Sequence, residues 1–174
     1  ILVLPGVGNI KYLSERFSAK HDLPALANSL KTKNIGIIGI CLGFQFLCQS
    51  SSEHDRSQCL SMLDLKVEAL FNPPKPSVGW RYVAPNKTNE LVEPLANVIG
   101  GGCFYFTHCY GVKKLPPASN YLNPYGYATE GSNAAVAAVV SKRIIGLQFH
   151  PEKSGKIGSD TLKSAIEFLA MEAI

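Results

Sequence analysis

The chain has 174 residues, a net charge of +4, and 46% hydrophobic against 17% charged residues, a length that allows one domain with a sizeable core. Its lysines and arginines are dispersed rather than grouped, which argues against nucleic-acid binding, and no apolar run is long enough to span a membrane. Five cysteines without a C-x-x-C pair predict free thiols in a reducing cytoplasm, and the four histidines show no spacing typical of a metal site.

The first part of the chain predicts alternating strands and helices. ILVLPGVGN indicates a short buried strand followed by a glycine-rich turn, and this abrupt start leads us to expect a missing N-terminal βα unit. Residues 22–33 show helical apolar spacing with Asp22 as the N-cap, and NIGIIGI indicates a strand buried on both faces. A further helix is expected to begin after Cys41. This alternation predicts an α/β fold with a parallel sheet.

The middle of the chain is different in character. Residues 50–58 are polar and predict a loop. Three short strands are expected among prolines and glycines, at residues 66–71, 80–85 and 103–112. The segment therefore interrupts the simple α/β alternation.

The last part of the chain predicts a β-hairpin and a helix. Residues 134–140 and 143–149 are apolar and are separated by two polar residues. Residues 159–174 have the spacing of an amphipathic helix, with Ser159 or Asp160 as its cap. The buried stripe expected on this helix consists of Leu162, Ile166 and Leu169.

Cys41 lies between Gly39 and Gly43, at the junction of a predicted strand and a predicted helix. A nucleophile on such a sharp turn needs small neighbours, because strand and helix must approach each other closely. The helix N-terminus favours thiolate over thiol, so a lowered pKa is expected for Cys41. The N–H of Leu42 would point toward a developing oxyanion. Taken alone, the pattern fits a buried structural cysteine equally well.

The segment QFHPEKSG could supply a base for this thiol. His150 follows a predicted strand, and Glu152 lies two residues further on. Side chains at positions i and i+2 of an extended chain project to the same side, so Glu152 could orient the imidazole while His150 takes the thiol proton. The H-P-E motif alone would fit a capping histidine and a solvated glutamate.

Together, PGVGN, GICLGFQ, YFTHCY and GLQFHPEKSG resemble the triad (class I) glutamine amidotransferases. Within that family, PGVG, VGW and HPEKS are most similar to the glutaminase subunits of imidazole glycerol phosphate synthase. The resemblance covers nearly the whole chain. It implies a flavodoxin-like α/β fold: a central, mostly parallel sheet flanked by helices, with an antiparallel β excursion. It also implies one domain over residues 1–174 that needs no cofactor. That domain would hydrolyse L-glutamine to glutamate and ammonia through a cysteinyl thioester.

The resemblance also implies individual roles. Cys41 would be the nucleophile, His150 the general base and then acid, and Glu152 the orienting carboxylate. The oxyanion would be bound by the N–H groups of Val7 and Leu42. The implied substrate-binding residues are Gly8, Gly43, Gln45, Glu53, His108, Cys109 and Tyr110. Most family members have serine or threonine in place of the cysteine of H-C-Y, so only a backbone contact is expected there.

Trp80, Arg81 and Lys153 fall where the family contacts a (β/α)8-barrel cyclase, with which the chain would form a heterodimer in histidine biosynthesis. Arg81 replaces the usual asparagine, and Trp80 could instead be a core residue. The alternatives that remain open are a paralogous glutaminase for bacterial surface-sugar amination, a non-catalytic amidotransferase-like interaction module, and a cysteine peptidase or thiol sensor. The complete set of triad residues favours the enzyme.

Overall fold

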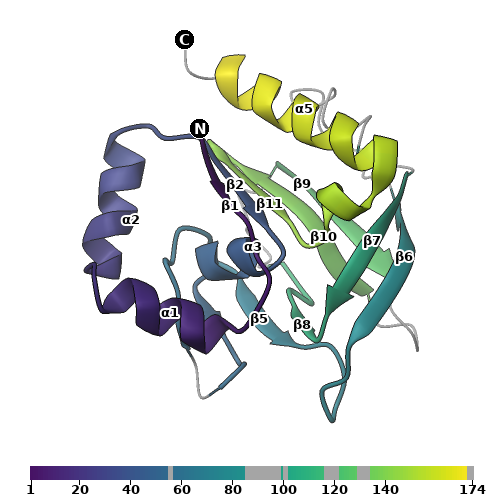
Figure 1. Cartoon of the computed structure of the whole chain (residues 1–174), viewed down its shortest axis with the longest axis horizontal. Helices are drawn as coiled ribbons and strands as arrows, with labels where there is room; N and C mark the ends of the chain where they lie inside the picture. Colours follow the sequence, from purple (N-terminus) through teal and green to yellow (C-terminus); the bar gives the residue numbers. More distant parts are fainter. Residues whose placement is uncertain (55–56, 85–98, 100–101, 116–121, 129–133, 172–174) are drawn as a thin grey trace.

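A computed structural model describes residues 1–54, 57–84, 99, 102–115, 122–128 and 134–171. Its main sheet has seven strands in the order β1-β2-β11-β10-β9-β6-β7 (Figure 1). The strands at one end pair in parallel, and they are β1 (Leu2–Leu4), β2 (Ile37–Ile40) and β11 (Ile144–Leu147). This parallel part carries the elbow at Cys41, as the strand and helix patterns predicted.

The rest of the main sheet is antiparallel and forms the excursion. It consists of β10 (Ala134–Ser141), β9 (Leu122–Ala128), β6 (Ser77–Ala84) and β7 (Gly102–His108). The predicted hairpin is confirmed, since β10 pairs antiparallel with β11. This antiparallel part continues the same sheet as the parallel strands.

A second, four-stranded sheet lies beside the pocket described below. Its strands are β4 (Ser57–Gln58), β3 (Ser50–Ser51), β5 (Lys66–Ala69) and β8 (Tyr110–Gly111), in this spatial order. The prediction of a loop over residues 50–58 was thus wrong for β3 and β4, which are strands of two residues each. Such short strands leave no alternating pattern that could be recognised from sequence.

The first two helices are α1 (Ile10–Ser18) and α2 (Leu23–Thr32). The predicted cap of α2 is confirmed, since the Asp22 carboxylate accepts from the Ala25 N–H at 2.9 Å. α1 was not predicted. It begins after Asn9, whose side-chain oxygen accepts from the first backbone N–H groups of the helix.

The last helix, α5 (Gly155–Met171), begins earlier than its predicted caps. Ser159 lies inside the helix, where its hydroxyl donates to the carbonyl of Gly155. Ile166 is 46% exposed, so the predicted buried stripe was wrong at that position. The buried face of the helix instead consists of Gly158, Thr161, Ala165, Phe168 and Leu169. None of the helices in the described ranges has the length and apolar character needed to cross a membrane.

Helices cover both faces of the parallel strands (Figure 1). Consecutive side chains of a strand point to opposite faces. Ile37 packs into the cluster formed with α1, α2 and α3 (Leu42–Leu47), whereas Ile38 packs into the cluster that contains Phe168 of α5. The prediction that β2 is buried on both faces is therefore confirmed.

The prediction of a buried first strand was wrong. Among the described strands β1 lies at the edge of the sheet with β2 as its single partner, and Val3 is 45% exposed.

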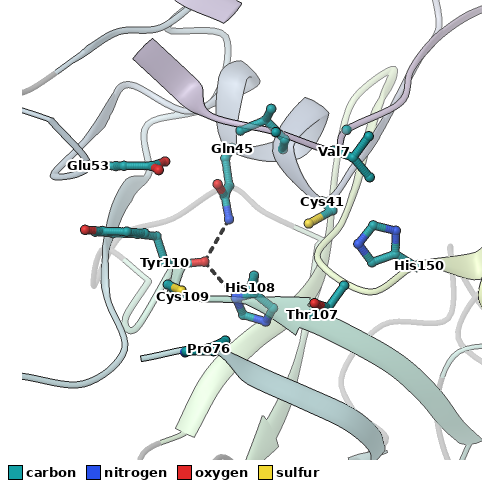
Figure 2. A pocket seen from close by; sticks show the side chains of 13 residues that line it. Val7, Cys41, Gln45, Glu53, Pro76, Thr107, His108, Cys109, Tyr110 and His150 are labelled. Atoms are coloured by element: carbon teal, nitrogen blue, oxygen red, sulfur yellow. Dashed lines mark hydrogen bonds between the residues drawn. The ribbon is translucent and has the colours of Figure 1, made fainter. Parts of the chain in front are cut away.

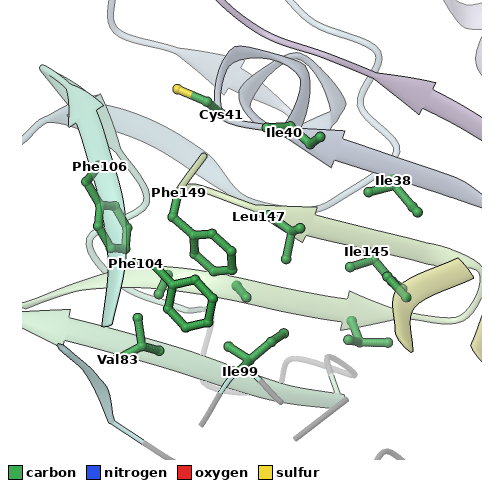
Figure 3. Packing of buried hydrophobic residues seen from close by; sticks show 14 of the residues in the cluster. Ile38, Ile40, Cys41, Val83, Ile99, Phe104, Phe106, Ile145, Leu147 and Phe149 are labelled. Atoms are coloured by element: carbon green, nitrogen blue, oxygen red, sulfur yellow. The ribbon is translucent and has the colours of Figure 1, made fainter. Parts of the chain in front are cut away.

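An aromatic cluster holds the end of β11 against β7 (Figure 3). The ring of Phe149 stacks on Phe104 at 4.1 Å between centroids and meets Phe106 edge-on at 5.8 Å. All three rings are fully buried. Because Phe149 directly precedes His150, this packing fixes the position from which the histidine side chain leaves the core.

Candidate active site

The backbone turns sharply at Cys41. β2 ends at Ile40, α3 begins at Leu42, and Cys41 between them has φ 48° and ψ −106°. A positive φ is uncommon for a residue with a Cβ and marks a strained position. The Cys41 N–H donates to the carbonyl of Leu147 at 2.7 Å. The thiol therefore stands on a rigid elbow at the start of a helix, as the G-x-C-x-G spacing predicted.

Glycines make this elbow possible because backbones nearly touch there. A Cβ on Gly43 would lie 1.9 Å from the carbonyl oxygen of Leu4, and a Cβ on Gly6 would lie 2.3 Å from the Gly43 nitrogen. A Cβ on Gly39 would lie 2.8 Å from the Cα of Phe44. The P-G-V-G turn is thereby held directly against the elbow.

His150 and Glu152 are paired as predicted. His150 Nδ1 lies 2.7 Å from a carboxylate oxygen of Glu152, and the imidazole is 1% exposed. Within the described part of the chain, His150 Nε2 is buried without a hydrogen-bond partner. Figure 2 shows this imidazole and the Cys41 sulfur on the same side of the pocket. The unpartnered nitrogen can thus serve as a proton acceptor for a group at the elbow.

β7 holds the segment that carries this pair. The His150 N–H donates to the Tyr105 carbonyl at 2.9 Å, and the Tyr105 N–H donates to the Ser154 hydroxyl at 3.0 Å. The same hydroxyl donates to the His150 carbonyl at 2.6 Å. These hydrogen bonds hold both ends of the short helix η3 (Pro151–Lys153) against β7.

The prediction of a lowered thiol pKa was wrong. Burial raises the pKa of Cys41 to about 12, and the nearby Glu152 carboxylate adds to the rise. The Leu42 N–H, the Gln148 amide and Lys153 oppose it but do not compensate for the lost solvation. The resting group is therefore a thiol, and a thiolate forms only when its proton passes to a base.

A cavity of about 320 Å³ opens at the elbow. Several predicted site residues line it together with Cys41 and His150, namely Val7, Gly8, Leu42, Gln45, Glu53, His108, Cys109 and Tyr110. Gly43 does not line it, because its place is against Leu4, so its predicted role in substrate contact is not supported. Gly6 of the P-G-V-G turn also lines the cavity, and the sequence missed Pro76 and Thr107 on its wall. Pro76 lies just before β6, and no local signal marks it.

One backbone carbonyl organises the polar wall of this cavity (Figure 2). The oxygen of Tyr110 lies 2.7 Å from Gln45 Nε2 and 2.7 Å from His108 Nδ1. Because a carbonyl can only accept, both nitrogens must carry hydrogens. The Cys109 carbonyl is bonded to the Leu70 N–H at 2.9 Å, so it serves the β5–β8 ladder rather than the cavity.

Glu53 brings a carboxylate to the opposite wall. Asn9 Nδ2 donates to its Oε1 at 3.2 Å, and His54 Nε2 lies 3.9 Å from the same oxygen. The Glu53 side chain is 16% exposed. A largely buried carboxylate with weak partners favours a cationic ligand group.

We expect a pH dependence of stability from His108. Burial lowers its pKa to about 4, below the ordinary 6.5, although the bond to the Tyr110 carbonyl acts in the opposite direction. As pH falls, His108 is therefore protonated in the unfolded chain before it is protonated in the folded chain. The free energy of unfolding should fall by up to a few kcal/mol as pH drops from 6.5 to about 4. Urea unfolding at several pH values measures this slope. His108→Gln should flatten it, and an unchanged slope would contradict the assignment.

The predicted partner residues lie outside the cavity. Trp80 is 54% exposed on β6, flanked by exposed Val78 and Tyr82. The possibility that Trp80 is a core residue is thereby rejected. Its ring meets Tyr105 edge-on at 6.1 Å, and Lys153 Nζ lies 5.9 Å from the same Tyr105 ring.

Arg81 turns back onto its own strand instead of facing the partner residues. Its guanidinium donates to the carbonyls of Val78 and Trp80 at 3.3 and 3.2 Å. Gly79 between them has φ 124°, a value that glycine adopts readily. Arg81 thus stabilises the strand that presents Trp80.

Comparisons with known proteins agree with this geometry. The family model for "Glutamine amidotransferase class-I" matches residues 1–166. "Imidazole glycerol phosphate synthase subunit HisH 1" of Parasynechococcus marenigrum (strain WH8102) is 33% identical over 96% of this chain and 79% of its own. "Imidazole glycerol phosphate synthase subunit HisH" of Escherichia coli (strain K12) is 32% identical over 95% of this chain and 79% of its own.

Solved structures share the fold. A protein described as "Crystal structure of glutamine amidotransferase" superposes with a TM-score of 0.67 at 16% identity, over 99% of this chain and 78% of its own. The structure "Trypanosoma brucei CTPS - glutaminase domain with bound acivicin" superposes with a TM-score of 0.60 at 16% identity, over 98% of this chain and 70% of its own. The expected amidotransferase fold is thereby confirmed.

Proposed function

Because the chain belongs to the class-I glutamine amidotransferases, we propose that it is the glutaminase subunit of an imidazole glycerol phosphate synthase. The observation that carries the chemistry is the cavity in which a strained Cys41 shares a wall with a buried, carboxylate-paired His150. The test is the release of ammonia and glutamate from L-glutamine by the purified chain, with and without a (β/α)8-barrel cyclase. A cyclase that co-purifies identifies the pathway.

The proposed reaction begins when the Sγ proton of Cys41 moves to Nε2 of His150. The thiolate then attacks the carboxamide carbon of glutamine, and the N–H groups of Leu42 and Val7 bind the resulting oxyanion. His150 returns its proton to the leaving nitrogen, so ammonia departs and a γ-glutamyl thioester remains. Water, deprotonated by His150, hydrolyses the thioester to glutamate and free thiol.

Substrate recognition is proposed to use acceptors for the α-ammonium group. The amide nitrogen of Gln45 already donates to Tyr110 and Gln148, so its oxygen is the part that can serve a ligand. That oxygen and the Glu53 carboxylate are both acceptors on the cavity wall. A charged donor such as an α-ammonium group satisfies both.

The turn at Val7 is suited to change its orientation. Val7 is 79% exposed, and Gly8 beside it has φ 122°. A peptide flanked by glycines can rotate at low cost. A docked partner could therefore select the orientation in which the Val7 N–H faces the oxyanion, which would keep the isolated chain a poor glutaminase.

Glu152→Gln should lower kcat by about a thousandfold, less than removal of the nucleophile, because the base and the thiol both remain. The expected cause is loss of the Nδ1 contact at 2.7 Å, which fixes the tautomer and orientation of His150. Glu167→Gln on α5 removes a distant exposed carboxylate and is the matched control. Steady-state ammonia release measures both, and equal rates for the two variants would refute the role of Glu152.

Trp80→Ala should weaken cyclase docking at least about tenfold and reduce the activation that docking gives, because a large exposed aromatic is the usual anchor of an interface. Tyr12→Ala removes another exposed aromatic, on α1, and should leave docking unchanged. Titration calorimetry with the cyclase measures the affinity. Unaltered affinity in Trp80→Ala would show that the partner binds elsewhere.

A further inference from the structure

A buried glutamine, Gln148, lies between the substrate-binding wall and the Cys41 sulfur. It follows β11 directly, is fully buried, and donates its backbone N–H to the Ala137 carbonyl at 2.8 Å. Its side-chain Nε2 lies 3.7 Å from Cys41 Sγ, and its Oε1 lies 3.2 Å from Gln45 Nε2. Burying an amide costs free energy unless the amide is hydrogen-bonded, and these two contacts satisfy the Gln148 side chain.

The Tyr110 carbonyl determines which end of each amide donates in these hydrogen bonds. The Tyr110 carbonyl can only accept, so the end of the Gln45 amide that faces it must be the NH2 group. The second hydrogen of that group points to Gln148, which must therefore turn its oxygen toward Gln45. This leaves the Gln148 NH2 group facing the sulfur of Cys41.

The surrounding structure holds the Gln148 amide in this place. Gln148 Oε1 lies close to the backbone of β8, since a Cβ on Gly111 would be in van der Waals contact with it at 3.4 Å. The contacts thus run from the Tyr110 carbonyl through two buried amides, those of Gln45 and Gln148, to the Cys41 sulfur.

We propose that Gln148 positions the Cys41 sulfur and stabilises its thiolate with an N–H donor whose direction is set by Tyr110 and Gln45. This inference rests on the proposed function, in which Cys41 is the nucleophile. The donor offsets part of the cost of placing a negative charge in a buried site. Because Gln45 belongs to the substrate wall, the same contacts tie the position of the bound substrate to that of the sulfur.

The test is the pH profile of Cys41 alkylation by iodoacetamide, followed by mass spectrometry of the Cys41 peptide. Gln148→Met keeps the size of the side chain and removes the donor. Gln148→Glu keeps an acceptor for Gln45 and replaces the donor with a carboxylate. Both should slow Cys41 alkylation about tenfold at a fixed pH below the thiol pKa, which corresponds to an upward shift of the profile by about one pH unit.

The exposed Gln49 provides the matched control, and Gln49→Met should keep the parent profile. A purely structural role predicts the opposite direction, because a loosened core exposes the sulfur and speeds its alkylation. If folded Gln148→Met or Gln148→Glu keeps or exceeds the parent rate, the inference is overturned. If instead the parent chain reacts no faster at Cys41 than at the buried Cys48, the proposed function itself fails.

Discussion

Cys41→Ala should lower glutamine hydrolysis by at least about four orders of magnitude, with the fold intact. The thioester needs a sulfur at the elbow, and Cys41 lines the same cavity as His150, whose buried Nε2 has no hydrogen-bond partner in the described part of the chain. Cys109 also lines the cavity, but it lies between β7 and β8, next to Tyr110 and away from the elbow (Figure 2). Alanine has one heavy atom fewer and can adopt the same elbow, so the loss should appear in kcat and not in stability.

The matched control is Cys103→Ala, which removes an exposed thiol on β7 and should keep the parent rate. Ammonia release in a coupled assay, together with a thermal unfolding curve for each variant, separates chemistry from folding. Substantial turnover in folded Cys41→Ala would reject the thioester mechanism.

Gly43→Ala should destabilise the protein by at least about 3 kcal/mol or prevent folding. The added Cβ would lie 1.9 Å from the Leu4 carbonyl oxygen, which belongs to the backbone and cannot move aside like a side chain. Relief of the clash would require β1 to move away from α3. The P-G-V-G turn that follows β1 would then leave the cavity.

Gly155→Ala is the appropriate comparison, because a Cβ there meets nothing within 4 Å and φ is +60°. Its cost should be limited to about 1–2 kcal/mol for the left-handed conformation. Denaturant unfolding measures both variants. If Gly43→Ala proved no more destabilising than Gly155→Ala, the close approach of β1 to the elbow would be contradicted.

Much of the fold and of the candidate site could be predicted because the signals are local. The elbow depends on adjacent glycines, the pairing of His150 with Glu152 depends on a spacing of two residues, and the Asp22 cap depends on its own helix. The residues that signal each of these features are close in sequence, so their types and spacing contain the information, although the elbow glycines also allow the approach of the distant Leu4 and Gly6.

The features that were missed depend on tertiary structure. The thiol pKa of Cys41 rises because the folded chain buries it, which outweighs the helix N-terminus. Ile166 is exposed because α5 buries the neighbouring face, which carries Ala165, Phe168 and Leu169. The contact between Gln148 and Cys41 joins residues 107 positions apart, and no local pattern reports it.

Labelling with an electrophilic glutamine analogue tests the central claim most directly. The chain is incubated with a glutamine-derived chloroketone, and the modified cysteine is identified by mass spectrometry while glutaminase activity is followed. The account predicts modification of Cys41 alone, one label per chain, protection by L-glutamine, and loss of activity in proportion to labelling. Labelling of Cys48 or Cys103 at the same rate, or full activity in a chain labelled at Cys41, would contradict it.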